Sequence, residues 1–294
     1  MNNSPERIKR LVIVGVGLIG GSLASSLKKL HLVDEIIGVG RSEENLITAH
    51  KMGLLDLYLT DPKNIPSDAD MVLIAVPVAQ TKLVFEAVAR KVSKSAIITD
   101  VGSTKEDIIS IAREALGDSF GRFVPAHPIA GGEKNGAIAA SDDLFLDKNV
   151  VLTPVEGTSE SAVNTVERMW QSVGANIVRL DASSHDVIFS AVSHLPHVVS
   201  FALVSMLAAR SDSQQLFSFA ASGFRDFSRI AGSSPEMWKD ICQSNKDKVL
   251  SDISDFKNVL EKIEQMMRGG DFGSLLDMFQ QASDARNKWA ERKQ

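Results

Sequence analysis

The chain contains a single cysteine, Cys242, among its 294 residues. One thiol cannot form an intrachain disulfide, so the sequence excludes a disulfide-stabilised scaffold and fits a reducing cytoplasm. A lone cysteine is more often a small core residue than a nucleophile, and we interpret Cys242 in that way. Positive charge is not in excess either: 32 Lys and Arg face 37 Asp and Glu. This balance gives no reason to expect a nucleic acid or an anionic membrane as partner.

Long apolar runs are also missing. No apolar run reaches the length of a membrane span, and the N-terminus lacks the hydrophobic core of a signal peptide. We therefore expect no membrane partner and a cytoplasmic protein. A chain of 294 residues that is 44% hydrophobic and 23% charged allows two globular domains with a substantial core.

A glycine-rich turn lies close to the start of the chain. The apolar run 11–14 leads into this turn, and a helix with apolar periodicity follows. Gly15, Gly17 and Gly20 have the G-x-G-x-x-G spacing of a dinucleotide site. The first glycine makes the sharp turn, the second lets the backbone approach a pyrophosphate, and the third lets the helix pack closely on the strand. The anion would then bind the free N–H groups at the helix N-terminus.

The residue after the second strand, predicted at 35–40, selects the cofactor in such folds. Arg41 and Ser42 occupy this position, where a guanidinium and a hydroxyl suit the 2′-phosphate of NADP. Glu43 and Glu44 lie slightly beyond the position at which a carboxylate binds the ribose hydroxyl of NAD, but they leave NAD as an alternative cofactor. The candidate cofactor-binding residues are Gly15, Gly17, Leu18, Ile19, Gly20, Arg41, Ser42, Val76 and Pro77.

Aliphatic strands alternate with helices as far as residue 180, which predicts one doubly wound parallel sheet. The later strands are expected at 71–76, 96–100, 123–126, 149–154 and 176–180. From residue 183 the pattern is helical only, with helices expected at 186–209, 214–222, 224–231, 235–268 and 272–292. The fold class is therefore α/β, with a Rossmann-like domain over 1–181 and an all-helical domain over 182–294.

An apolar stripe follows the helix expected at 235–268. Its members recur at i, i+3 or i+4: Leu250, Ile253, Phe256, Leu260, Ile263 and Met267. Packing within one subunit is one explanation. A dimer interface is favoured, because so long a stripe needs more partner surface than about 110 residues readily supply.

A nicotinamide fold implies hydride transfer, so the site needs a base for a hydroxyl proton and anchors for substrate charge. His127 is the best candidate base, because it directly follows a strand and precedes a proline and a glycine-rich loop. Ser103, on a loop at the same sheet edge, is a candidate orienting partner. His185 starts the helical domain and is interpreted as a cap or hinge residue.

Two further segments carry candidate substrate contacts. His194 and His197 lie three residues apart, but no third ligand has suitable spacing for zinc, so core histidines or substrate contacts stay open. Arg225 and Arg229 flank Asp226, and arginine clamps carboxylates in bidentate fashion. A surface ion-pair network is the alternative interpretation. No metal site is predicted.

Together these residues resemble the prephenate/arogenate dehydrogenase family, also called cyclohexadienyl dehydrogenases, of tyrosine biosynthesis. The resemblance follows the chain in order, over residues 15–22, 100–105, 127–131, 193–197 and 223–229. It implies oxidative decarboxylation of a cyclohexadiene acid: the ring carbon that bears the hydroxyl gives a hydride to the nicotinamide, and the ring carboxylate leaves as CO2. It also implies a homodimer built through the helical domain.

The resemblance assigns roles at the reacting end of the substrate. His127 would accept the hydrogen bond from the ring hydroxyl and take its proton. Ser103 would hold His127 and touch the hydroxyl or the nicotinamide end.

The resemblance assigns the other end of the substrate as well. Arg229 would bind a carboxylate with Asp226 orienting it, and His197 with Ser193 would contact the side chain. Trp238 matches an aromatic position near the pocket, although core packing explains it equally well. Glu133 would pair with the ammonium of arogenate or act as a loop charge, so prephenate and arogenate both remain open.

Two other functions are consistent with parts of the sequence. Another two-domain reductase, such as a β-hydroxyacid or 3-hydroxyacyl dehydrogenase, would need its own lysine or histidine arrangement on the first interdomain helix. A dinucleotide-sensing or structural dimer would bind cofactor without turnover and would be indifferent to a change of His127.

Overall fold

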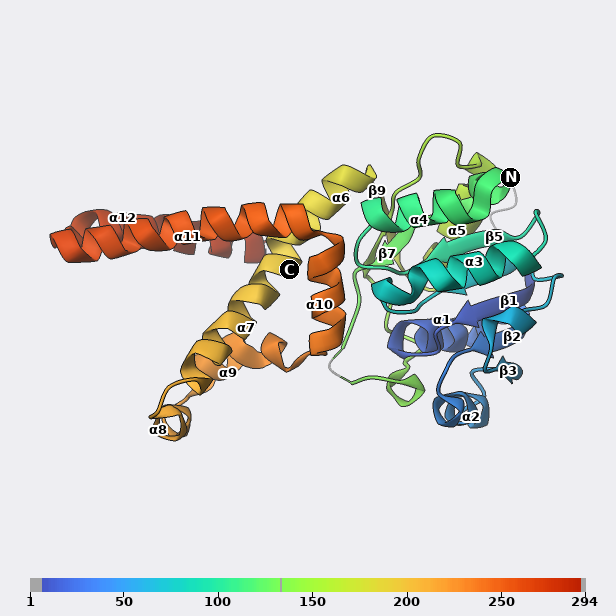
Figure 1. Cartoon of the computed structure of the whole chain (residues 1–294), viewed down its shortest axis with the longest axis horizontal. Helices are drawn as coiled ribbons and strands as arrows, with labels where there is room; N and C mark the ends of the chain where they lie inside the picture. Colours follow the sequence, from blue (N-terminus) through green and yellow to red (C-terminus); the bar gives the residue numbers. More distant parts are fainter. Residues whose placement is uncertain (1–6, 133, 292–294) are drawn as a thin grey trace. The chain divides into compact units, whose positions relative to one another are not determined.

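A computed structural model describes residues 7–132 and 134–291, and the chain forms two compact units, Met1–Lys246 and Asp247–Gln294. The first unit opens with a six-stranded parallel sheet in the order β3-β2-β1-β4-β5-β6 (Figure 1). Its strands are β1 (Ile8–Val14), β2 (Val33–Val39), β3 (Leu57–Leu59), β4 (Met71–Ile74), β5 (Ile97–Asp100) and β6 (Phe123–Val124). The predicted Rossmann-like sheet is confirmed, although the short strand β3 was not foreseen.

Helices cover both faces of this sheet, and each face has its own apolar core. The helices are α1 (Leu18–Lys29), α2 (Glu43–Lys51), α3 (Thr81–Lys91), α4 (Glu106–Leu116) and α5 (Glu160–Ser172). Side chains of α1 and α5 share one core, and those of α3 and α4 share the other. Short 3₁₀ turns lie at η1 (Pro62–Asn64), η2 (Val78–Gln80), η3 (Gly117–Arg122) and η4 (Ala137–Ala139).

The expectation of one sheet is wrong for the last strands, which form a second sheet. Its strands are β7 (Ala126–Pro128), β8 (Asn149–Leu152) and β9 (Asn176–Arg179), with β7 antiparallel to β8. The predicted strand 123–126 breaks at Pro125, because proline has no N–H for the ladder. The Ala126 N–H donates instead to Asp100 Oδ1 at 3.0 Å. This bond holds the start of β7 beside the carboxyl end of β5.

The second half of the chain is helical, as predicted. The first unit ends with α6 (Ala182–Phe189), η5 (Ser190–His194), α7 (Leu195–Ala208), α8 (Ser213–Ser218), α9 (Ser222–Ser228), η6 (Arg229–Gly232) and α10 (Pro235–Ser244). The segment η5 is a single π-helical stretch. It ends two residues before Pro196, which lacks the N–H for an ordinary i→i−4 bond and would crowd the carbonyl one turn earlier.

The helix predicted over 235–268 is in fact two helices, α10 and α11 (Lys246–Gly269), which is a correction. They are separated at Asn245. Its buried side chain donates to the Asp186 carbonyl at 2.8 Å and contacts His194 Nδ1 at 3.2 Å. The apolar periodicity of the sequence continues through Asn245, so it predicts no break there. The helix ends because the Asn245 side chain bonds residues far away in the sequence.

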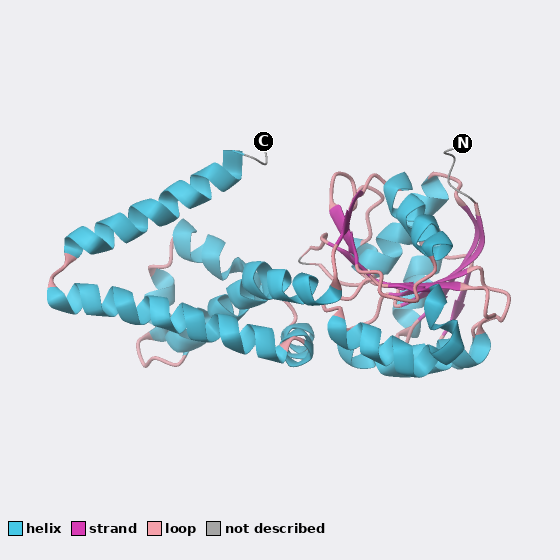
Figure 2. Cartoon of the chain, turned by 90° about the horizontal axis from the view of Figure 1, so that it is seen from above, coloured by secondary structure: helices cyan, strands magenta, loops and turns pink. Residues whose placement is uncertain are grey.

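The second unit consists of α11 and α12 (Phe272–Glu291), which diverge from the turn at Gly270 (Figure 2). Leu250, Leu260 and Met267 of the predicted stripe are 53%, 48% and 56% exposed. Within α11, which the structure describes in full, Val249 is the one buried residue. Packing within a single chain therefore leaves half of the stripe exposed, while Ile253, Phe256 and Ile263 are half-buried.

The chain is continuously helical from Ala182 to Ala208. This helical stretch is 27 residues long and apolar enough to cross a membrane by length and composition alone. Ser193, His194 and His197 interrupt its apolar sequence, so it contains no uninterrupted apolar run of that length. Only 17% of its most apolar window is buried within the chain, so much of its surface stays open to a partner.

Candidate active site

The glycine turn between β1 and α1 is built as a tight reversal. Gly15 has φ +99°, and a Cβ there would lie 2.3 Å from the Ala75 carbonyl oxygen. A Cβ on Gly20 would lie 2.3 Å from the Gly15 carbonyl oxygen, whereas one on Gly17 would meet no atom within 4 Å. The first and third glycines are therefore required by packing, and the second faces open space.

The N-terminus of α1 offers free backbone donors. Gly17 is its N-cap and provides no side-chain cap, and the first turn holds no acidic residue. The N–H groups of the first turn, which includes Leu18 and Ile19, have no intrahelical partner. The side chain of Ile19 packs against the core. This arrangement fits a dinucleotide pyrophosphate.

A cavity of about 480 Å³ opens in front of this turn. Its walls include the glycine turn, the residues after β2 and the loop after β4: Val14, Gly15, Val16, Gly17, Gly40, Arg41, Ser42, Asn45, Ala75, Val76 and Pro77. Arg41 is its one charged wall residue among the described residues. Ser42 Oγ accepts a hydrogen bond from Asn45 N as the N-cap of α2, which leaves the hydroxyl proton for a ligand. The cavity thus accepts a dinucleotide.

His127 lies on β7 and contacts the helical half of the chain. Its Nδ1 lies 2.8 Å from His185 Nε2, and the Phe189 ring packs against both imidazoles. Ser103 lies, partly buried, in the loop between β5 and α4. The structure therefore gives the Nδ1 side of His127 to His185 rather than to Ser103. His185 is fully buried, which corrects its interpretation as a cap or hinge residue; Asp181 is the N-cap of α6.

A buried ion pair between Lys105 and Asp100 lies beside the start of β7. Lys105 is fully buried, and its Nζ donates to Asp100 Oδ2 at 2.5 Å and to the Ala126 carbonyl at 2.9 Å. Burial lowers the pKa of His127 well below the ordinary 6.5, and the nearby His185, Lys105 and His194 lower it further. His127 is therefore neutral near pH 7 and able to accept a proton.

The second histidine pair divides between two environments. His194 is buried and bonds Asn245, whereas His197 stacks on Trp238 with ring centroids 3.6 Å apart. Burial lowers the pKa of His197, and the nearby charge of Arg229 lowers it further. A hydrogen bond with the Ile230 backbone raises this pKa but does not cancel the decrease. Among the described residues, His197 Nδ1 and Trp238 Nε1 are buried without a hydrogen-bond partner.

Arg229 begins η6 and is exposed, close enough to His197 to influence its titration. Asp226 is exposed on α9, three residues before it, and Ser193 is partly buried in η5. The structure therefore brings Arg229, His197 and Trp238 together. His194 connects them to the other cluster, because it contacts Trp238 and influences His127.

Two candidates need separate mention. Glu133 lies outside the described residues. Within the residues that the structure describes, no group of three His, Cys, Asp or Glu side chains could hold a metal ion.

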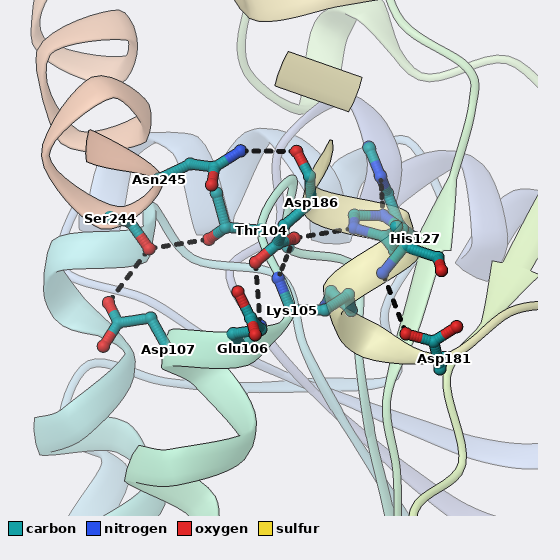
Figure 3. A network of polar contacts seen from close by, with 12 residues as sticks. Thr104, Lys105, Glu106, Asp107, His127, Asp181, Asp186, Ser244 and Asn245 are labelled. Carbon is teal, nitrogen blue, oxygen red and sulfur yellow. Dashed lines mark hydrogen bonds and ion pairs between the residues drawn. The ribbon is translucent and has the colours of Figure 1, made fainter. Parts of the chain in front are cut away.

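Sequence reasoning missed a set of buried polar residues that joins the two halves of the chain (Figure 3). Asp186 accepts the N–H groups of Lys105 and Glu106 at 2.8 and 2.9 Å. Ser244 Oγ contacts Thr104 Oγ1 at 2.8 Å and donates to Asp107. No local signal in the sequence marked these residues for burial, because ionisable side chains are mostly exposed unless they are paired.

Comparison with known proteins agrees with this geometry. The family model for the prephenate dehydrogenase nucleotide-binding domain matches residues 23–179, and that for the prephenate dehydrogenase dimerization domain matches residues 181–281. Prephenate dehydrogenase of Bacillus subtilis is 36% identical over 279 residues, which cover 94% of this chain and 75% of that protein.

Two further relatives match almost end to end. Cyclohexadienyl dehydrogenase of Zymomonas mobilis is 32% identical, over 95% of each chain. The crystal structure of prephenate dehydrogenase from Aquifex aeolicus, in complex with hydroxyphenyl propionate and NAD+, superimposes with a TM-score of 0.91 at 32% identity. That alignment covers 97% of this chain and 99% of the other.

Proposed function

The chain belongs to the prephenate dehydrogenase family, and on that premise we propose that it oxidises prephenate and releases the ring carboxylate as CO2. It is an NAD(P)-dependent oxidoreductase of the kind that serves tyrosine biosynthesis. The observation that carries the proposal is the neutral imidazole of His127, whose Nδ1 is hydrogen-bonded to another imidazole. Its Nε2 side is the one that would face a substrate hydroxyl.

A nicotinamide cofactor held in the cavity beside Gly15, Gly17 and Arg41 would supply the acceptor for a hydride from the ring carbon that carries the hydroxyl. His127 accepts the hydroxyl proton as carbonyl character develops at that carbon. When the carbon–carboxylate bond breaks, its electron pair enters the ring, and His127 returns the proton to the resulting phenol oxygen. The products are a phenol, CO2 and the reduced nicotinamide, with no net proton released. Since aromaticity drives the second step, the protein need only position and polarise the substrate.

The other end of the substrate is assigned to the cluster around Arg229. Arg229 binds a side-chain carboxylate through charge-assisted hydrogen bonds, and Asp226 orients the guanidinium. His197 and Ser193 contact the pyruvyl end. Support comes from the buried and unpartnered His197 Nδ1 next to Trp238, among the described residues. Ser103 is assigned to the ring hydroxyl or the nicotinamide end.

We further propose that NADP is the preferred cofactor. The described cavity wall carries Arg41 and no carboxylate, and Arg41 has no ion-pair partner within residues 7–132 and 134–291. A free guanidinium favours a 2′-phosphate, whereas NAD requires an acceptor for its ribose hydroxyl.

Changing Arg41 to Asp is expected to shift the ratio of kcat/KM for NADP+ over NAD+ toward NAD+ by at least about 100-fold, because an attractive charge becomes a repulsive one. Arg41→Ala should lower the NADP+ value alone. The measurement is steady-state kinetics with each cofactor at saturating prephenate. An unchanged ratio in both variants would refute the assignment.

The acid limb of kcat/KM should lie below pH 6.5, the ordinary pKa of histidine. His127 must be neutral to accept the proton, so activity is full above its pKa and is lost as the pH falls through it. Lys105, His185 and His194 face His127 and act together with burial to lower that pKa, which moves the limb down. A pH profile measured with saturating NADP+ checks this, and a limb at or above 6.5 would contradict it.

The helical half supports the assembly. The match to a dimerization domain agrees with a homodimer. We propose that the exposed members of the α11 stripe and the apolar surface of α7 form the contact between the two subunits. We keep 1–181 and 182–294 as the functional division, with nucleotide binding in the first part and substrate binding and dimerisation in the second. The single thiol Cys242, whose pKa burial raises, is in keeping with a cytoplasmic enzyme.

The proposed function is tested by incubating the purified protein with prephenate, arogenate or a simple 3-hydroxy acid, each with NAD+ and with NADP+, and following the absorbance of the reduced nicotinamide. Turnover of prephenate with NADP+ is expected to be fastest. Turnover of 3-hydroxy acids alone would favour the other two-domain reductases, and cofactor binding without any turnover would favour a sensing dimer.

A further inference from the structure

Asp186 is a carboxylate held entirely by donors. It is 1% exposed, and its Oδ1 accepts from Lys105 N and from His185 Nδ1, both at 2.8 Å. Its Oδ2 accepts from Glu106 N at 2.9 Å. Burial alone would raise the pKa of Asp186, but the bonds from His185, Glu106 and Lys105 lower it below 3.8 overall. The side chain is therefore anionic and can only accept hydrogen bonds.

This carboxylate determines where His185 carries its hydrogen. Because Asp186 Oδ1 only accepts, the hydrogen of their 2.8 Å contact belongs to His185 Nδ1. Burial lowers the pKa of His185, so the imidazole is neutral and carries a single N–H. Its Nε2 is then a lone pair, and this atom faces His127 Nδ1 at 2.8 Å.

The protonation of His185 in turn determines which nitrogen of His127 carries its hydrogen. The contact between the two imidazoles needs one hydrogen, and His185 Nε2 has none to give. His127 Nδ1 must therefore donate, which leaves the His127 Nε2 lone pair free. Phe189 packs against both rings, with centroids 4.9 Å from His127 and 4.5 Å from His185, and limits their rotation.

We propose that Asp186 and His185 are positioning residues that hold His127 in the tautomer with its proton on Nδ1 and its Nε2 ready to accept the substrate hydroxyl proton. The inference deepens the proposed function and rests on it. When His127 takes that proton on Nε2, its positive charge lies in line with His185 and the Asp186 anion, and no group has to turn. The proton leaves again from Nε2 to the phenol oxygen.

The pair lies in the middle of α6, where it also joins this helix to α4. The Asp186 carboxylate caps the N-terminus of α4 through two backbone N–H groups, so one side chain joins α4 to α6 and directs the imidazoles toward β7. Asn245 holds the backbone of Asp186 in place, because its side-chain Nδ2 donates to the Asp186 carbonyl at 2.8 Å.

The direct test is ¹⁵N NMR of selectively histidine-labelled protein near neutral pH, in which the shifts distinguish protonated from unprotonated ring nitrogens. The imidazole that disappears in His127→Asn is thereby assigned to His127. We expect its hydrogen on Nδ1 in the full-length wild-type protein. A hydrogen on Nε2 would overturn the proposal, and this result does not depend on activity.

The kinetic test compares two substitutions of one residue. His185→Leu leaves His127 Nδ1 without an acceptor and should lower kcat by about 10²-fold with little change in KM. His185→Gln keeps a carbonyl toward His127 and an amide N–H toward Asp186, and should recover kcat to within about tenfold of wild type. Thermal melting and NADP+ binding report whether each variant is folded.

Equal kcat values for folded His185→Leu and wild type would overturn the proposal, as would a His185→Gln no better than His185→Leu. A wild-type protein inactive on prephenate and arogenate would instead reject the proposed function, while the NMR result would still decide the tautomer.

Discussion

His127→Asn is expected to lower kcat with prephenate by about 10²–10⁴-fold, the range for loss of a general acid–base group. Asparagine has an amide that cannot take a proton from the substrate hydroxyl at neutral pH. KM should change little, because the proposed carboxylate contacts lie with Arg229. The effect is expected to be large since hydride departure and proton removal from the same C–OH group support each other.

The matched control for this change is His31→Asn. His31 is exposed and has φ +56°, a conformation that asparagine tolerates well, so kcat should stay at the wild-type value. A fall of less than about threefold in His127→Asn, in a protein that still binds NADP+, would remove His127 from the catalytic role.

Arg229→Ala should raise KM for prephenate by roughly 10–100-fold, which corresponds to about 1.5–3 kcal/mol for hydrogen bonds to a charged group. The substitution removes the cation that would bind the side-chain carboxylate, far from the reacting carbon, so kcat should fall much less. Because the charge of Arg229 also lowers the pKa of His197, that pKa should rise in the variant. The measurement is a full kinetic curve in prephenate at saturating NADP+.

Arg225→Ala is the matched control for this second prediction. Arg225 is an exposed arginine on α9, four residues from Arg229, and is assigned no contact with substrate. Its removal should leave KM within about twofold. A flat KM in Arg229→Ala, or equal effects of the two substitutions, would place the carboxylate clamp elsewhere.

The dinucleotide half could be predicted from the sequence because its signals are local. The positive φ of Gly15 and the uncapped start of α1 follow from glycine spacing within a few residues. Arg41 and Ser42 follow from their place after a recognisable strand. In each case the position of the residue is determined by its neighbours in the chain.

The second sheet and the helix break depended on contacts that no local pattern contains. Pro125 was visible, but the bond from Ala126 N to Asp100 that redirects the chain joins residues 26 positions apart. Asn245 ends α10 by bonding Asp186 and His194, 59 and 51 positions away. A continuous apolar pattern therefore predicted one helix where two exist.

The candidate site shows the same division. His127 stood out by its place after a strand, whereas its partner His185 was interpreted as a cap or hinge, because the contact between them spans 58 positions. Lys105 was not among the candidate site residues, yet it is fully buried against Asp100. Sequence reasoning thus found a candidate base but not the residues that hold it.

The proposed function requires that one substrate molecule contact both His127 and Arg229. The measurement that tests this most directly is a crystal structure of the protein with NADP+ and a hydroxyphenyl carboxylate that mimics the product. The account predicts the phenol oxygen within hydrogen-bond distance of His127 Nε2, and the ligand carboxylate on the Arg229 guanidinium. A ligand that touches neither side chain, or an Arg229 directed to solvent away from it, would contradict the account.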